Sequence, residues 1–450
     1  MSCLSSRRLA AAWIRRAHST SPLLGASSRS LSSGGGAQVP DPRGSPVIPS
    51  FGLTPEATPT PAFVGVRPSY ITKDLRVVAP MDHPEWPVFR LLEETGIPLD
   101  GAELPEGSPE LWERVYRFMI RLQEMDVVFY GSQRQGRISF YMTSTGEEAC
   151  FIGSAAALDD KDTVLGQYRE TGIIMWRGFS VQDVADQLFG NEQAKCRGRS
   201  MPMLFGSKDL HFHTMSAPLA TQIPQASGVA FTLRNTGNCA ICYFGEGAAS
   251  EGDFHGALNF AATLECPVIF FIRNNGYAIS TPTEEQYRGD GIISRAAGYG
   301  MHAIRVDGND VAAVYAATKA ARELCVQENK PVMIEALTYR VGHHSTSDDS
   351  TAYRSSEEIN SWKSERCPVK RTRGFLESMD LWNDDMERQA RREERIAVMK
   401  ALETAEARPK PPLDTLFTDV YADMPGHLQE QYNELLAHLE KYPAPGGAKH

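Results

Sequence analysis

The sequence predicts an α/β fold in which a mostly parallel sheet is covered by helices on both faces. The first observation is the order of the segments between residues 163 and 339, where short apolar runs typical of strands alternate with longer helical patterns. The second is the apolar run 267–272, which suits a buried strand. The third is size, because 450 residues of which 42% are hydrophobic are enough for a large core.

The individual elements follow from periodicity and from residues that cap helices. Strands are expected at 163–166, 239–244, 267–273, 303–306 and 332–339. Helices are expected at 108–130, 250–264, 310–327 and 381–407, with a last amphipathic helix around 428–439. Ser144 and Glu147 fit a capping box that opens a further helix, and Ser180 and Asp183 open another.

The composition excludes several classes of partner. The formal net charge is -10, and phosphate contacts need concentrated Lys and Arg, so we expect no nucleic-acid partner. No apolar run approaches the ~20 residues that a membrane helix needs, so we expect no membrane span. The eight cysteines are scattered, which favours a reduced compartment. We interpret Cys239 and Cys242, a C-x-x-C pair, as small core residues of a strand rather than a redox or zinc motif.

The N-terminal residues differ in character from the rest of the chain. Residues 1–40 contain five arginines and many Ser and Ala, and no acidic residue precedes Asp41. This composition is typical of a mitochondrial transit peptide, and it predicts a location in the mitochondrial matrix. Residues 40–68 are rich in Pro, Gly, Ser and Thr, and we expect residues 41–105 to form an extended N-terminal arm.

A glycine turn follows the strand expected at 239–244. Gly245, Glu246 and Gly247 lie between that strand and a helix for which Ser250 and Asp253 fit a cap. Glycines let the backbone approach a phosphate, and a helix N-terminus offers free N–H groups to it. A dinucleotide fingerprint would need a third glycine where Ser250 stands, which weakens an NAD interpretation.

A second polar turn follows the next strand along the chain and contains Asn275. Glu246 and Asn275 should both lie at the carboxyl ends of strands, where open α/β sheets bind their ligands. A carboxylate, an amide oxygen and a main-chain carbonyl are hard oxygen donors, so with phosphate oxygens they suit Mg²⁺. The pairing resembles the thiamine diphosphate motif, with Glu246 in place of the usual Asp.

The resemblance extends over residues 130–354, which look like the alpha subunits of 2-oxo-acid dehydrogenases. It rests on Gln167-Tyr168-Arg169-Glu170 and on the loop that begins at Ser216 and ends at Gln222. It implies that residues 106–360 form the thiamine-diphosphate-binding domain and residues 361–450 a helical C-terminal region. The tail, including 416–425, is similar to the branched-chain members of the family.

The resemblance also implies a set of ligands. The implied cofactor contacts are Tyr168, Arg169, Gly245, Gly247, Ala248, Arg273 and His344. The implied Mg²⁺ ligands are Glu246, Asn275 and the main chain of Tyr277, and the implied K⁺ ligands are Ser216, Pro218, Thr221 and Gln222. Ala217 stands where many relatives have Ser, so it is not counted as a side-chain ligand.

The segment 340–350 resembles the family's regulatory phosphorylation loop. The resemblance implies that His344 assists acyl transfer, that Ser345 is the principal phosphorylation site and that Ser355 is a second. Phosphate on Ser345 would add roughly two negative charges beside Asp348 and Asp349 and should disorder the loop. The His-His-Ser-Thr-Ser-Asp-Asp form is similar to the branched-chain enzymes rather than to the pyruvate enzymes.

The activity that the resemblance implies needs partner chains. Thiamine diphosphate would carry the decarboxylation of 2-oxo acids from valine, leucine and isoleucine, and the acyl group would pass to a lipoyl group on an acyltransferase core. Because only one set of cofactor-domain signals is present, a separate beta subunit should supply the rest of the site in a two-alpha, two-beta assembly. A regulatory kinase and phosphatase are implied as well. The alternatives are a pyruvate or acetoin dehydrogenase alpha subunit, and a cofactor-fold protein that has lost catalysis.

Overall fold

The computed structural model describes residues 75, 77, 79, 85–418 and 420–442. The predicted transit peptide at 1–40 and the Pro-rich segment 40–68 lie outside the described residues. No helix in the described part of the chain is both long and apolar enough to cross a membrane.

The centre of the described structure is a six-stranded parallel sheet in the order β2-β1-β3-β4-β8-β7. Its strands are β1 (Thr163–Leu165), β2 (Phe212–His213), β3 (Ala240–Gly245), β4 (Val268–Asn274), β7 (His302–Asp307) and β8 (Val332–Leu337). A separate two-stranded hairpin pairs β5 (Tyr277–Ala278) with β6 (Thr281–Pro282). The predicted α/β fold with a mostly parallel sheet is confirmed.

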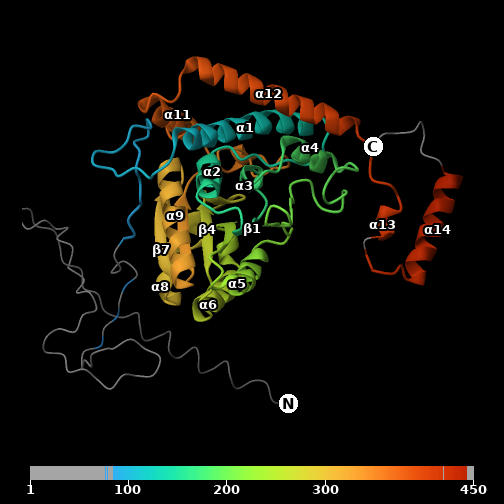
Figure 1. The fold of residues 1–450 in the computed structure, drawn as a ribbon, viewed down its shortest axis with the longest axis horizontal. Coiled ribbons are helices and arrows are strands. Elements are labelled where there is room, and N and C mark those ends of the chain that lie inside the picture. The colour runs from blue at the N-terminus through green and yellow to red at the C-terminus, as the bar shows by residue number, and fades with distance from the viewer. Residues whose placement is uncertain (1–74, 76, 78, 80–84, 419, 443–450) are drawn as a thin grey trace, which may run out of the picture. The chain divides into compact units, whose positions relative to one another are not determined.

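Helices connect and cover these strands (Figure 1). They are α1 (Pro109–Arg134), α2 (Glu148–Ala156), α3 (Thr171–Trp176), α4 (Val181–Phe189), α5 (Gln222–Leu233), α6 (Gly252–Thr263), α7 (Thr283–Gln286), α8 (Ala296–Tyr299), α9 (Val311–Glu328), α10 (Ser356–Ser364), α11 (Pro368–Ser378), α12 (Asp384–Ala407), α13 (Thr415–Thr418) and α14 (Gly426–Lys441). Three short 3₁₀ helices lie at Ala248–Ser250, Ile293–Arg295 and Ser350–Ala352.

Two apolar clusters lie on opposite faces of the sheet, because successive side chains of a strand point to opposite sides. In β3, Ile241 and Tyr243 join the cluster shared with α1, α2 and α9, whereas Cys242 and Phe244 join the cluster shared with α5 and α6. Figure 1 shows α12 lying along α1 on the first side and α5 and α6 on the other. Cys242 is free and buried, as the core interpretation of the C-x-x-C pair expects.

The segment before α1 runs along the free edge of β7. Phe89 forms a parallel bridge with Val306, and the N–H groups of Leu91 and Leu92 both donate to the Asp310 carboxylate at 2.7 Å. Asp310 also caps α9, so one buried carboxylate joins this segment to the helix.

Two of the predicted helix caps are wrong and one is confirmed. Ser180 and Asp183 form the expected capping box of α4. Ser144 and Glu147 form none at α2, because the Glu147 carboxylate is bonded to Arg273, 126 residues further on. Ser250 does not cap α6, since the 3₁₀ helix Ala248–Ser250 intervenes and α6 begins at Gly252.

Candidate active site

The two polar turns predicted to bind a metal lie side by side at the carboxyl ends of β3 and β4. Gly245 is in register with Arg273, which brings the residues that follow each strand together. The backbone N–H of Asn275 donates to Glu246 Oε2 at 3.3 Å. The side chains of Glu246 and Asn275 are both buried. The sheet topology therefore joins residues that are far apart in the sequence.

The oxygens of these turns are held in a fixed arrangement. Asn275 Oδ1 accepts from the N–H of Tyr277 at 3.3 Å, and the carbonyl of Tyr277 accepts from Arg340 Nη1 at 3.2 Å. Burial disfavours the charged carboxylate of Glu246 and raises its pKa to about 7. A cation beside the carboxylate would favour the charged form again. Within the described residues no group of three His, Cys, Asp or Glu is placed to hold a metal, so a cation here would depend on amide, carbonyl and phosphate oxygens.

Two carboxylates that are not among the predicted site residues, those of Glu147 and Glu170, surround Arg273. Glu147 Oε2 accepts from Arg273 Nη1 at 2.5 Å, and Glu170 Oε1 accepts from Nε and Nη2 at 3.0 and 2.6 Å. The side chains of Arg273, Glu147 and Glu170 are all buried. Buried, hydrogen-bonded ion pairs hold their side chains in fixed positions, unlike ion pairs on the surface. In the sequence, Glu147 and Glu170 share one feature, since each directly precedes a buried helix, α2 or α3.

A glycine allows Glu147 to reach the site. Gly146 has φ +100°, and a Cβ there would lie 2.2 Å from the carbonyl oxygen of Tyr339. Only glycine accepts both the left-handed backbone and this close approach. The Gly146 N–H donates to the Glu148 carboxylate, whereas the Glu147 carboxylate points toward Arg273.

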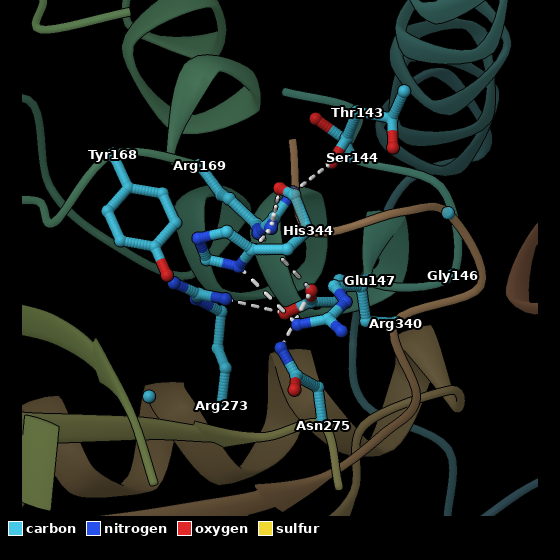
Figure 2. A network of polar contacts seen from close by, with 12 residues as sticks. Thr143, Ser144, Gly146, Glu147, Tyr168, Arg169, Arg273, Asn275, Arg340 and His344 are labelled. Atoms are coloured by element: carbon cyan, nitrogen blue, oxygen red, sulfur yellow. Dashed lines mark hydrogen bonds and ion pairs between the residues drawn. The ribbon is translucent and has the colours of Figure 1, made fainter. Parts of the chain in front are cut away.

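Arg169 and Arg340 come from different elements and converge on His344 (Figure 2). Arg169 Nη1 donates to the carbonyl of Thr143 at 2.8 Å, and its Nη2 donates to the carbonyl of His344 at 2.5 Å. Arg169 Nη2 and Arg340 Nη1 lie 3.3 and 3.4 Å from His344 Nδ1. Since both neighbours are donors, Nδ1 is the acceptor and Nε2 carries the proton.

His344 is a neutral imidazole in this environment. Burial lowers its pKa to about 3, and the charges of Arg169 and Arg340 act in the same direction. Its ring packs edge to face against Tyr168 with centroids 5.8 Å apart. Burial also raises the pKa of Tyr168. The structure thus places the predicted residues Tyr168, Arg169 and His344 together.

The segment that follows His344 is tied back to the site by its own side chains. Asp348 accepts from the N–H of His344 at 2.8 Å and from the hydroxyl of Tyr353 at 2.6 Å, and Tyr353 in turn accepts from Arg340 Nη2 at 2.9 Å. Ser345, the predicted phosphorylation site, is buried with 8% of its surface exposed. A kinase would therefore reach it only after this segment opens.

The remaining predicted residues lie elsewhere. Ser355 is exposed and caps α10 by accepting from the N–H of Glu358. In the loop before α5, Thr221 Oγ1 donates to the carbonyl of Pro218 at 3.1 Å, and Gln222 Nε2 donates to the carbonyl of Tyr243 at 3.1 Å. The structure brings the oxygens of Thr221 and Pro218 together. The Gln222 side chain is buried.

The donor set fits an anionic diphosphate together with a divalent cation. Arg169 Nε and Arg340 Nε are buried and have no hydrogen-bond partner among the described residues, so each can still donate to an anion. Gly247 lies close against the β5–β6 hairpin, since a Cβ there would lie 2.7 Å from Ala278 Cβ. The helical turn that directly follows Gly247 is the 3₁₀ helix Ala248–Ser250, and α6 begins only at Gly252.

Comparisons with known proteins agree with this geometry. Residues 116–414 match the model of the family described as dehydrogenase E1 component. The chain is 52% identical over 384 residues to the 2-oxoisovalerate dehydrogenase subunit alpha, mitochondrial, of Macaca fascicularis, covering 85% of this chain and 86% of that one. The Homo sapiens protein of the same name is 52% identical over 384 residues, with the same coverage. The Arabidopsis thaliana 2-oxoisovalerate dehydrogenase subunit alpha 2, mitochondrial, is 46% identical over 381 residues, covering 83% and 80%. On these matches, the chain belongs to the dehydrogenase E1 component family.

Proposed function

We propose that this chain is the alpha subunit of a mitochondrial dehydrogenase that oxidatively decarboxylates branched-chain 2-oxo acids with thiamine diphosphate. The observation that carries the proposal is the meeting of Glu246 and Asn275 beside three buried arginines, together with relatives named 2-oxoisovalerate dehydrogenase subunit alpha, mitochondrial. The same names favour the branched-chain substrate over the pyruvate or acetoin alternative, and the intact site argues against a chain that has lost catalysis.

The residues of this chain would hold the diphosphate half of the cofactor. Arg169 and Arg273 would bind phosphate oxygens, and Gly245, Gly247 and Ala248 would let the backbone approach them. Glu246, the Asn275 amide and the Tyr277 carbonyl would bind Mg²⁺. When bound, thiamine diphosphate supplies the electron-accepting ring that makes decarboxylation possible.

His344 would act at the mouth of this site. Its neutral ring, with the proton on Nε2, can donate one hydrogen bond to a substrate or acyl group while Nδ1 stays fixed by Arg169 and Arg340. The buried arginines and the apolar edge of Tyr168 would keep water from the reacting atoms.

A second ion and several partner chains belong to the proposal. The Thr221 and Pro218 oxygens, with Ser216 and Gln222, would bind K⁺ and stabilise the loop before α5. A beta subunit would supply the other half of the site in a two-alpha, two-beta assembly, and a lipoyl-bearing acyltransferase core would take the acyl group. A kinase and a phosphatase would act on Ser345, with Ser355 as a second position.

The substrate class is tested by a decarboxylation assay on the chain co-expressed with a matched beta subunit. We expect kcat/KM for the 2-oxo acids of valine, leucine and isoleucine to exceed that for pyruvate by about tenfold or more, since one or two methylenes in an apolar pocket contribute roughly this much. The control is each subunit alone, which should be inactive. Equal or higher kcat/KM with pyruvate would reject the branched-chain assignment.

A further inference from the structure

Glu147 makes hydrogen bonds to two different functional residues, and its Oε1 also lies 4.0 Å from Arg169 Nε. Its Oε2 accepts from Arg273 Nη1 at 2.5 Å, and its Oε1 accepts from Asn275 Nδ2 at 3.1 Å. The side chain is 1% exposed and comes from the start of α2, whereas both partners lie at the end of β4 (Figure 2). One carboxylate therefore contacts both the residue proposed to bind phosphate and the residue proposed to bind metal.

The bond to Asn275 determines which end of its amide faces the metal turn. An amide has a donor end and an acceptor end, and a carboxylate accepts only from the donor. With Nδ2 on Glu147, Oδ1 is turned toward the N–H of Tyr277, on the same turn whose Asn275 N–H contacts Glu246. An oxygen ligand is thus presented where a cation needs one, which is the usual task of a group behind a metal ligand.

The bond to Arg273 fixes the plane of the guanidinium. Glu170 takes one edge through Nε and Nη2, and Glu147 takes Nη1. Of the five N–H groups of an arginine, three are used by these bonds, which leaves two for a phosphate. The two carboxylates therefore hold the Arg273 guanidinium in one orientation, in which its two remaining N–H groups can donate to an anion.

We infer that Glu147 is a positioning residue that orients Arg273 for the diphosphate and Asn275 for Mg²⁺ at the same time. The inference rests on the proposed function, because it presumes that thiamine diphosphate and Mg²⁺ bind here. It assigns to Glu147 a different task from Glu170, which contacts Arg273 but not Asn275. It also separates Glu147 from the adjacent Glu148, which contacts Gln123 and Gly146 instead.

The variant that tests this role is Glu147→Gln. A glutamine has one acceptor oxygen, so it can serve Arg273 or Asn275 but not both. The wild-type and variant complexes with the beta subunit are stripped of cofactor, and thiamine diphosphate binding is followed by calorimetry while Mg²⁺ is varied. Because removal of a group behind a metal ligand weakens metal affinity about 10- to 100-fold, we expect the Mg²⁺ concentration for half-maximal binding to rise by at least about tenfold.

A second metal distinguishes positioning from general damage. Mg²⁺ demands near-ideal octahedral geometry and Ca²⁺ does not, so the Ca²⁺ midpoint should rise by less than the Mg²⁺ midpoint in Glu147→Gln. Glu170→Gln should weaken cofactor binding equally with both metals, because Glu170 holds Arg273 and the N–H groups of Gln167 and Tyr168 but does not contact Asn275. Glu148→Gln, the matched buried neighbour, should leave both midpoints within about twofold of wild type.

Three results would overturn the inference. The first is an Mg²⁺ midpoint in Glu147→Gln equal to that in Glu148→Gln. The second is an equal increase of the Mg²⁺ and Ca²⁺ midpoints in Glu147→Gln. The third is a change in the ratio of the Mg²⁺ midpoint to the Ca²⁺ midpoint that is as large in Glu170→Gln as in Glu147→Gln. If Glu147→Gln does not fold, Glu147→Asp decides, since it keeps the charge but shortens the arm and should also raise the Mg²⁺ midpoint. Failure of the wild type to bind the cofactor would reject the proposed function, whereas wild-type binding with an unaltered Glu147→Gln rejects the inference alone.

Discussion

Replacing Glu246 with alanine should abolish the Mg²⁺-dependent binding of thiamine diphosphate. Glu246 is the carboxylate of the metal turn, and the remaining Asn275 and Tyr277 oxygens carry no formal charge to neutralise a divalent cation. We expect the cofactor affinity to fall by about 100-fold or more, the upper range for loss of groups at a metal site. Titration calorimetry on the complex with its beta subunit, with and without Mg²⁺, measures the change.

Glu251→Ala is the matched control, because Glu251 follows the same turn but is exposed at the start of α6. Its cofactor affinity should equal that of wild type. Unchanged Mg²⁺-dependent affinity in Glu246→Ala would refute the metal assignment, whatever the control does.

Ser345→Glu should reduce the decarboxylation rate by about tenfold or more. Ser345 is buried, so a charged side chain there carries a desolvation cost that the segment can relieve only by opening. The new charge also stands three residues before Asp348, which holds the N–H of His344 and the Tyr353 hydroxyl. Opening would release His344 from Arg169 and Arg340 and disturb the site.

Two control variants make the Ser345 result specific. Ser345→Ala removes the hydroxyl without adding charge and should keep most of the activity. Ser347→Glu adds the same charge at an exposed position two residues on and should have a small effect. A fully active Ser345→Glu enzyme, or equal losses in Ser345→Glu and Ser347→Glu, would argue against this segment as a phosphorylation switch.

Most strands of the sheet and the long helices α1, α9, α12 and α14 could be predicted because their signals are local. The runs that became β3 and β4 are apolar throughout and bounded by turn residues, and Ser180 caps α4 through a residue three positions away. Helix α3 was missed, because all six of its residues, Thr171–Trp176, are buried and leave no amphipathic pattern. The wrong cap at Glu147 has a different cause, because the partner of its carboxylate, Arg273, is distant in the sequence.

The candidate site could be predicted only in part. Glu246 and Asn275 each follow a strand, so the rule that parallel strands end at one edge was enough to pair them. Glu147 and Glu170 have no such signal, because Arg273, which both of them contact, is brought to them only by the fold. The bonds that place Asp348 and Tyr353 around His344 likewise depend on how one segment turns back on itself.

The central claim is that this chain holds the Mg²⁺-diphosphate half of a thiamine diphosphate site that a beta subunit completes. The most direct measurement is calorimetric titration of thiamine diphosphate into the chain co-purified with its beta subunit, with Mg²⁺ present and then with the metal removed by a chelator. We expect saturable binding at one site per alpha chain with Mg²⁺ and loss of that binding after chelation. Absence of binding in the presence of Mg²⁺ and the beta subunit, or equal binding without the metal, would contradict the account.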